Sequence, residues 1–267
     1  MLHGHEGSVL FAAVTPDGGT LLSGANDGVL RGWALACATG VDLARHSGAI
    51  AGLGEPRPGL LASLSRGALR VDDPRTAEVL HDMRELPRVG AELACAGESG
   101  RIATLSTQSG VADPTEVLSV WSVESGLIFQ RELEQSAADV DITPDGRLVA
   151  LGFEAGKILV LDAGTGAEQR ALSQEGGVAA LALHPGGELL IAAGPSGKGR
   201  TLVWSVETGE ARPFPEPSLR PLRFVAGGEL VAMADELTVS LWRTADLART
   251  AVFHGHADAV ADAVLSP

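Results

Sequence analysis

Two pairs of histidines could form a metal site. His3-Gly4-His5 lies near the start of the 267-residue chain, and His254-Gly255-His256 lies near its end. Four imidazoles brought together could bind zinc, which takes four ligands in tetrahedral geometry. The Gly-His pairs, however, also open two units of an internal repeat, and His3 and His254 merely precede them. We therefore predict no metal site here and no cofactor.

Two other segments could bind ions. Asp139, Asp141 and Asp145 offer carboxylate oxygens of the kind that calcium takes, but they lack the spacing of an EF-hand loop. We expect Asp145 in a turn and the other two at a strand start, facing solvent. Residues 194–200 are rich in glycine and carry two cations, yet a phosphate cradle needs a helix to follow. Residues 201–204 have the pattern of a strand, which favours a flexible hairpin loop.

The sequence carries no familiar catalytic signature. It has no Gly-x-Ser-x-Gly, no His-Glu-x-x-His and no Walker-type phosphate loop. The formal net charge of −14 disfavours nucleic-acid binding, which needs clustered Lys and Arg. The two cysteines form no disulfide framework, and no apolar run is long enough to cross a membrane. We predict a non-catalytic cytoplasmic protein that binds neither nucleic acid nor membranes.

An internal repeat organises the chain and would position all of these residues. The turn Thr-Pro-Asp-Gly at residues 15–18 recurs at 143–146, and related turns follow at intervals of 41, at 184–187 and 225–228. Such a fixed period is typical of repeat architectures. A second marker, after the third apolar run of each unit, keeps the same phase: Trp33, Asp72, Trp121, Leu161, Trp204 and Trp242.

Each repeat contains four short apolar runs separated by turn residues. In the first they are residues 9–14, 20–23, 29–33 and 41–44. This pattern predicts a four-stranded antiparallel meander, which must stack on its neighbours because both of its faces are apolar. No repeat has the 3.6-residue periodicity of a helical solenoid. The sequence therefore predicts an all-β protein, a β-propeller of four-stranded antiparallel blades.

The first repeat resembles the WD40-repeat β-propeller family, in which Gly-His opens a repeat and Trp-Asp ends its third strand. The resemblance rests on Gly4-His5, the turn at 15–18, residues 22–28 and Trp33. It implies a scaffold for protein partners, held by a structural hydrogen-bond tetrad that consists of His5, Ser23, Asp27 and Trp33.

Other repeats depart from the family pattern. Only the first repeat keeps all four tetrad members, and no Trp is followed by Asp. Arg66 and Ala155 stand at the Asp27 position of two repeats. The residues at the His5 position are His46, Pro87, Leu133, Gln174, Pro215 and His256.

The repeats predict one propeller domain over residues 1–267. Residues 255–267 parallel residues 4–16, so we expect six complete repeats and the first strand of a seventh, hence an incomplete ring. Either a longer propeller or an interrupted reading frame would explain this. The predicted repeats span about 3–44, 45–83, 84–133, 134–172, 173–214 and 215–253, with a partial repeat at 254–267.

Loops on one rim of such a propeller are the expected partner-binding surface, because rigid scaffolds display recognition residues on loops. The longest insertion runs over residues 107–116. We predict a scaffold for protein–protein interactions. The alternatives are a sensor or regulatory module of a larger signalling protein with a kinase or NTPase domain, and a metal-dependent propeller hydrolase. The candidate rim residues are Ser8, Leu10, Asn26, Glu92, Gln108, Asp113, Lys198, Arg200 and Arg220.

Overall fold

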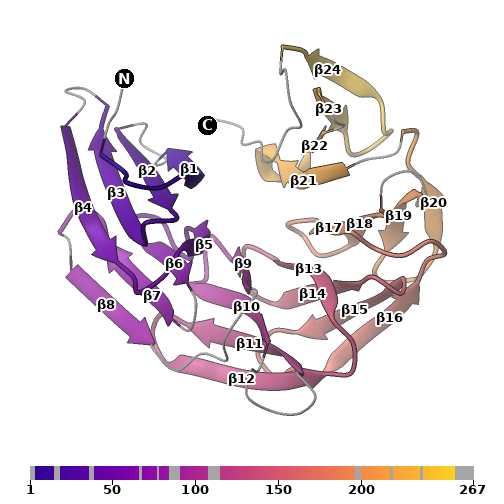
Figure 1. Cartoon of the computed structure of the whole chain (residues 1–267). Helices are drawn as coiled ribbons and strands as arrows, with labels where there is room; N and C mark the ends of the chain where they lie inside the picture. The colour runs from indigo at the N-terminus through magenta and orange to yellow at the C-terminus, as the bar shows by residue number, and fades with distance from the viewer. Residues whose placement is uncertain are drawn as a thin grey trace. The chain divides into compact units, whose positions relative to one another are not determined.

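A computed structural model describes residues 4–14, 19–35, 39–65, 68–76, 78–83, 91–107, 115–195, 200–216, 219–234 and 237–255. These residues form six antiparallel sheets of four strands each, which we number 1 to 6 in chain order (Figure 1). The predicted all-β fold with six four-stranded repeats is confirmed. The predicted seventh first strand lies outside the described residues.

The chain divides into two compact units, which are described separately. Unit 1 comprises Met1–Glu134 and contains sheets 1 to 3. Its strands are β1 (Val9–Val14), β2 (Thr20–Ala25), β3 (Val29–Ala34) and β4 (Thr39–Arg45); β5 (Ile50–Gly54), β6 (Leu61–Ser65), β7 (Ala68–Asp73) and β8 (Glu78–Met83); and β9 (Ala91–Cys95), β10 (Arg101–Thr107), β11 (Glu116–Ser122) and β12 (Gly126–Leu133).

Unit 2 comprises Gln135–Leu265 and contains sheets 4 to 6. The prediction of one domain over residues 1–267 stays a prediction. The strands of this unit are β13 (Ala137–Ile142), β14 (Leu148–Phe153), β15 (Lys157–Asp162) and β16 (Glu168–Ser173); β17 (Ala180–Leu183), β18 (Leu189–Ala193), β19 (Thr201–Ser205) and β20 (Ala211–Pro213); and β21 (Leu219–Val225), β22 (Leu230–Ala234), β23 (Val239–Arg243) and β24 (Arg249–Phe253).

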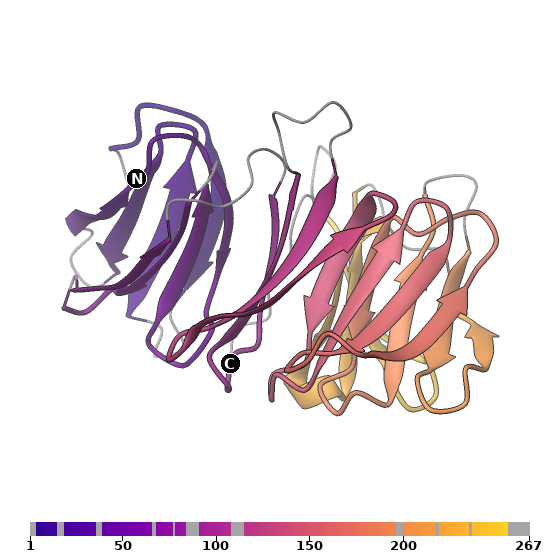
Figure 2. The ribbon, with the colours of Figure 1, turned by 90° about the horizontal axis from the view of Figure 1, so that it is seen from below.

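Sheets stack through their faces within each unit, and the first strands of successive sheets contact each other (Figure 2). The two middle strands of a sheet are therefore covered on both sides, which explains why they read as continuous apolar runs rather than alternating ones. In sheet 4, β14 and β15 are almost wholly buried, whereas the fourth strand β16 is mostly exposed and polar. Among the described residues, no helix is long and apolar enough to cross a membrane.

Two carboxylates join the inner strands of sheets 4 and 5. Asp139 Oδ2 accepts the backbone N–H of Leu181 at 2.8 Å, and Asp141 Oδ2 accepts that of Leu183 at 2.7 Å. The expectation that these aspartates face solvent was therefore wrong. Inner strands of neighbouring sheets do not pair with each other, so their N–H groups need side-chain acceptors. Burial raises the pKa of Asp141 to about 6, although the bound N–H groups and Arg223 oppose the change.

Asp145 lies, as expected, in the turn between β13 and β14. Its carboxylate accepts the hydroxyl of Thr143 at 2.7 Å and the backbone N–H of Arg147 at 2.9 Å. Together with the guanidinium of Arg147, these donors hold the pKa of Asp145 below its ordinary value, against the opposing effect of burial, which is the largest single influence. Asp145 thus stabilises a turn, and it does not join Asp139 and Asp141 in one site.

A nitrogen-bearing side chain on the fourth strand latches neighbouring sheets together in both units through its N–H donors. In unit 1, His81 Nε2 donates to the carbonyl of Val123 in sheet 3. In unit 2, Arg170 Nε donates to the carbonyl of Val206 in sheet 5 at 2.9 Å, and its Nη2 donates to that of Glu207. These side chains occupy matching places, because His81 pairs with Val71 on the third strand as Arg170 pairs with Val160.

The Arg170 latch can be tested with a matched control in the next sheet. Replacing Arg170→Met should lower the free energy of unfolding by about 1–2 kcal/mol, because the backbone carbonyls of Val206 and Glu207 lose their donor. Arg212→Met changes the same strand position in sheet 5, where the guanidinium has no partner within the described part of the chain, and should change stability by less than about 0.5 kcal/mol. Urea unfolding followed by tryptophan fluorescence measures both. Equal losses would assign the effect to the aliphatic stem instead.

Candidate functional site

Four side chains fasten the opening segment of the chain onto sheet 1. His5 Nδ1 lies 3.0 Å from Asp27 Oδ2, and His5 Nε2 lies 2.7 Å from Ser23 Oγ. Trp33 Nε1 donates to the same hydroxyl at 2.8 Å. With His5 protonated on Nδ1, every donor has an acceptor: the ring donates to Asp27, accepts from Ser23, and Ser23 accepts from Trp33. A satisfied network of this kind fixes the position of each member.

The carboxylate of Asp27 orients the hydrogen-bond network of the tetrad. Its carboxylate accepts the backbone N–H groups of Glu6 at 2.8 Å and Val29 at 2.9 Å in addition to His5. Burial acts to raise the pKa of Asp27, but these N–H groups and His5 outweigh it, and the pKa lies below its ordinary value. The ionised carboxylate thus holds both the incoming segment and the start of β3.

The comparison with known families agrees with this geometry. The family model of the WD domain, G-beta repeat, matches residues 1–34, which include all four tetrad residues. Residues 1–34 are thus similar to a WD40 repeat in sequence. The repeated four-stranded sheets that follow are consistent with further WD40-like repeats. No curated protein sequence matches the chain significantly.

Sheet 2 keeps the WD40 histidine but changes its partners. His46 Nε2 lies 2.8 Å from Ser63 Oγ, and His46 Nδ1 lies 2.8 Å from Ser65 Oγ, so a second serine replaces the aspartate. Asp72 occupies the position in sheet 2 that Trp33 occupies in sheet 1. It is buried and forms an ion pair with Arg70 at 2.8 Å. Burial raises the pKa of Asp72, while Arg70 lowers it.

The remaining tryptophans keep a hydrogen bond although the tetrad is lost. Each indole N–H donates to a polar atom within its own sheet or on the segment leading into it, so none of these three indole groups lacks an acceptor. The sequence analysis missed these replacement partners. The observed pairs are Trp121 with Thr104 (3.2 Å), Trp204 with Gln174 (3.4 Å) and Trp242 with Ser240 (2.8 Å).

Two glycines permit the close passage of one sheet to the next. Gly28 has φ +75° and Gly156 has φ +92°, conformations that favour glycine. Their carbonyls accept the backbone N–H of His46 at 2.7 Å and of Gln174 at 2.9 Å. A Cβ at either glycine would collide with the carbonyl of the same partner. The residue at the tetrad histidine position is therefore tied through its backbone to the preceding sheet.

Three of the predicted rim residues meet beside the tetrad. The backbone N–H of Asn26 donates to the carbonyl of Ser8 at 3.0 Å, and both residues are exposed. Leu10 lies next to them on β1 and is 47% exposed. A bulge between Val9 and Phe11 interrupts the pairing of β1 with β2, and bulges re-aim side chains. The bulge leaves Val9 exposed as well, at 54%, which the sequence analysis did not foresee.

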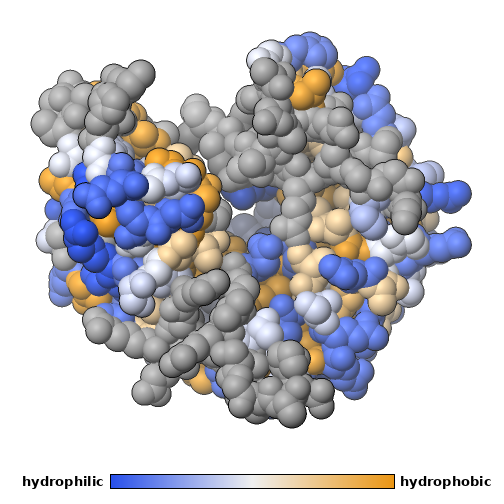
Figure 3. Space-filling view, viewed as in Figure 1, coloured by the Kyte–Doolittle hydropathy of each residue, from blue (hydrophilic) through white to orange (hydrophobic). Residues whose placement is uncertain are grey.

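The other rim candidates are not gathered with these three. Glu92 is half-buried on β9, Arg200 is exposed before β19, and Arg220 lies on β21. Gln108, Asp113 and Lys198 lie outside the described residues. On the face seen in Figure 3, the hydrophobic areas of each unit are small and are separated by hydrophilic residues. Beside the segment that the tetrad holds, Val9 and Leu10 form an exposed apolar pair.

The expected absence of a metal site stays a prediction. Within the ranges that the structure describes, no three His, Cys, Asp or Glu side chains gather as metal ligands would. Of the two histidine pairs, His5 belongs to the tetrad and His254 is exposed, while His3 and His256 lie outside the described residues. Most of the loop 194–200 also lies outside them.

Replacing Ser23→Ala tests the tetrad. The change removes the hydroxyl that joins His5 to Trp33, so two buried polar groups lose their partner, and we expect a loss of about 2 kcal/mol in the free energy of unfolding. Ser47→Ala, on an exposed serine of the same unit, is the matched control and should be near neutral. Urea unfolding monitored by fluorescence provides the measurement. A neutral Ser23 variant would contradict a structural role.

His46 should make stability depend on pH. Burial lowers the pKa of His46 to about 4, helped by Arg70 and opposed by Asp82. The unfolded chain, with its ordinary histidine pKa, takes up a proton before the folded one does as the pH falls from about 6.5 toward 4. The wild-type protein should therefore lose up to a few kcal/mol of stability across this window.

The variant His46→Gln keeps a hydrogen-bonding side chain but does not titrate. Its free energy of unfolding should fall less steeply than that of the wild type between pH 7 and pH 4.5, as measured by urea unfolding at each pH. Identical slopes for the two proteins would contradict the buried neutral state of His46.

Proposed function

We propose that this protein is a non-catalytic scaffold that binds protein partners, and that its six sheets act as one propeller domain over residues 1–267. The WD40 repeat at residues 1–34 supports the proposal, because domains of this family typically mediate protein–protein interactions. The site of action would be the cytoplasm, with proteins rather than nucleic acids or membranes as partners.

The observation that carries the proposal is the exposed apolar pair, Val9 and Leu10, placed on a bulge directly beside a fully hydrogen-bonded network. The network holds residues 5 and 6 before the bulge, and pairing with β2 holds β1 after it, so the pair is presented without a large entropic cost of ordering on binding. Apolar side chains held in this way can act as anchors at the centre of an interface. Ser8 and Asn26 would supply the polar surroundings.

The proposed surface includes the remaining rim candidates as peripheral contacts. Their polar and charged side chains suit the outer part of an interface, where residues stay partly hydrated and contribute to partner choice more than to affinity. These residues are Glu92, Gln108, Asp113, Lys198, Arg200 and Arg220.

Leu10→Glu tests this surface with an unusually close control. Leu10 and Leu35 are both 47% exposed. Leu10 lies on β1 of sheet 1, and Leu35 directly follows β3 of the same sheet. Partners captured from a lysate of the source cells by the wild-type chain should be reduced about tenfold or more with Leu10→Glu, because a charge would be buried in the interface. They should be retained with Leu35→Glu.

Two results would contradict the proposal. Equal capture by both variants would place the partner elsewhere, and the absence of any partner retained by the wild-type chain over a bead control would remove the scaffold function. Unfolding midpoints of both variants, measured in parallel, establish that each is folded.

A further inference from the structure

One backbone hydrogen bond that recurs in sheets 4, 5 and 6 shows which of their residues occupy equivalent positions. In each sheet, the residue two places after the end-marker position of the third strand donates its N–H to a residue in the turn between the first two strands. This bond fixes which positions match across the three sheets. The three bonds are Ala163 to Arg147 (2.8 Å), Val206 to Glu188 (2.9 Å) and Thr244 to Glu229 (2.9 Å).

At the junction of sheets 4 and 5, two arginines of sheet 4 close the space between the sheets. Arg170 donates to the carbonyls of Val206 and Glu207. Arg147 Nη2 donates to the carbonyl of Gly186 at 3.4 Å. Both arginines thus use N–H groups to satisfy backbone carbonyls in the turns of the next sheet.

At the junction of sheets 5 and 6, neither of these bonds is present. Glu188 replaces Arg147, and a carboxylate cannot donate to the matching carbonyl, that of Gly227. Arg212 keeps the position of Arg170 but has no hydrogen-bond or ion-pair partner among the described residues. The matching carbonyls of Thr244 and Ala245 likewise receive no donor from the described part of the chain.

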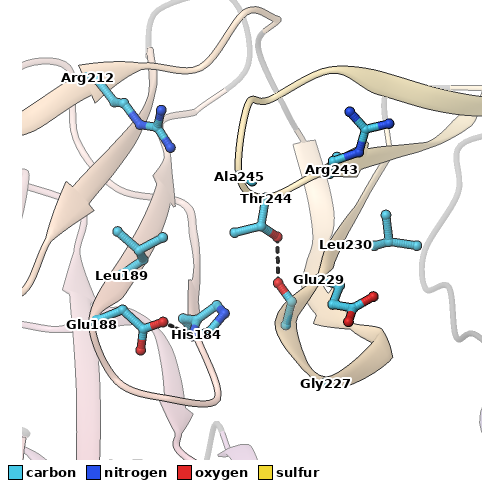
Figure 4. Close-up of a pocket in the computed structure, with 11 residues that line it drawn as sticks. His184, Glu188, Leu189, Arg212, Gly227, Glu229, Leu230, Arg243, Thr244 and Ala245 are labelled. Atoms are coloured by element: carbon cyan, nitrogen blue, oxygen red, sulfur yellow. Dashed lines mark hydrogen bonds and ion pairs between the residues drawn. The ribbon is translucent and has the colours of Figure 1, made fainter.

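The junction instead contains a cleft of about 620 Å³. That volume lies within the range of about 300–1,000 Å³ that is usual for ligand sites. Figure 4 shows Arg212 extending from sheet 5 toward the side formed by Thr244 and Ala245, with Glu188 and His184 at the other end of the same wall. Leu189 supplies apolar surface between them.

We propose that this cleft binds an extended peptide segment of a protein partner, anchored by an acidic side chain on Arg212. A guanidinium with no partner pairs well with a carboxylate through two parallel hydrogen bonds. The backbone N–H groups of the peptide would donate to the carbonyls of Thr244 and Ala245, as Arg170 does one junction earlier. This inference rests on the proposed scaffold function and names a second surface for it.

The charges of the cleft favour a peptide over a polyanion. The Glu188 side chain is 57% exposed and lies 2.9 Å from His184 Nδ1, and Glu229 lines the cleft from sheet 6. Arg243 also lines the cleft, but its guanidinium is paired with Asp246 at 2.7 Å. The two carboxylates and a net charge of −14 therefore repel phosphate groups. A basic side chain two residues from the acid would lie on the same face of an extended peptide and would contact Glu188.

A direct binding measurement tests the inference. The probe is a fluorescein-labelled alanine peptide with capped ends that carries one glutamate and, two residues later, one lysine; the comparison peptide has glutamine for glutamate. Titration of the full chain, followed by fluorescence anisotropy, should give saturable binding of the first peptide and binding about tenfold weaker for the second. Arg212→Gln should weaken binding of the first peptide about tenfold. Arg75→Gln, on an exposed arginine in unit 1, is the charge-matched control and should leave it unchanged.

A second variant keeps the test independent of misfolding. Glu188→Arg restores the residue type that closes the junction of sheets 4 and 5, so it should donate to the carbonyl of Gly227 and occupy the cleft. We expect this variant to lose peptide binding while its unfolding midpoint is equal to or higher than that of the wild type. Loss of peptide binding together with a lowered unfolding midpoint, or unchanged peptide binding, would count against the proposed position of the peptide in the cleft.

Three results would overturn the inference: no saturable binding of the glutamate peptide, wild-type affinity in Arg212→Gln, or tighter binding of tripolyphosphate or single-stranded RNA than of the peptide at the same site. The proposed function has a separate readout. If partner capture remains sensitive to Leu10→Glu while the peptide fails to bind, only the cleft is rejected; if the peptide binds and no partner is captured through Leu10, only the rim surface is rejected.

Discussion

Backbone groups that face a neighbouring sheet, with no strand beside them to pair with, impose the main constraint on this structure. Strand pairing ends at the edge of each four-stranded sheet, so N–H and C=O groups at the junctions need partners from elsewhere. Asp139 and Asp141 accept two such N–H groups, and Arg170 donates to two such carbonyls. Side chains that bond across the junctions thus hold the stacked sheets in register, in addition to the apolar contacts between their faces.

The same requirement explains how the tetrad can vary without loss of the fold. In the four sheets that contain a tryptophan, what must be satisfied is the indole N–H, rather than a fixed set of four residue types. Sheet 1 does so with His5, Ser23 and Asp27, while sheet 5 uses the single amide of Gln174, which accepts from Trp204 and donates to Gly177. The repeats can therefore diverge in sequence while they retain the same four strands.

Both proposed recognition sites lie where the repeating pattern is interrupted. At the bulge in β1 the chain gains one unpaired residue, and Val9 and Leu10 become exposed beside a rigid network. Between sheets 5 and 6, Glu188 stands where Arg147 stands in sheet 4, and Arg212 has no partner among the described residues; a cleft lies there, whereas Arg147 and Arg170 bridge the previous junction. In both places, side chains that make no bond between sheets lie on an ordered backbone. Binding of a partner there would cost little backbone entropy, which favours selective binding.

The sequence by itself determined the all-β class, the period of 41 residues and the four strands of each repeat, and it predicted the members of the first tetrad. These depend on local turn chemistry and on residue types that recur at fixed intervals, such as Gly4-His5 with Trp33. Only the tertiary structure decided that Asp139 and Asp141 join two sheets, that Leu10 lies on a bulge, and that Arg170 bonds to the next sheet whereas Arg212 has no partner within the described ranges. Each of these depends on strand register or on the distance between residues about 40 positions apart, which side-chain type and spacing along the chain do not specify.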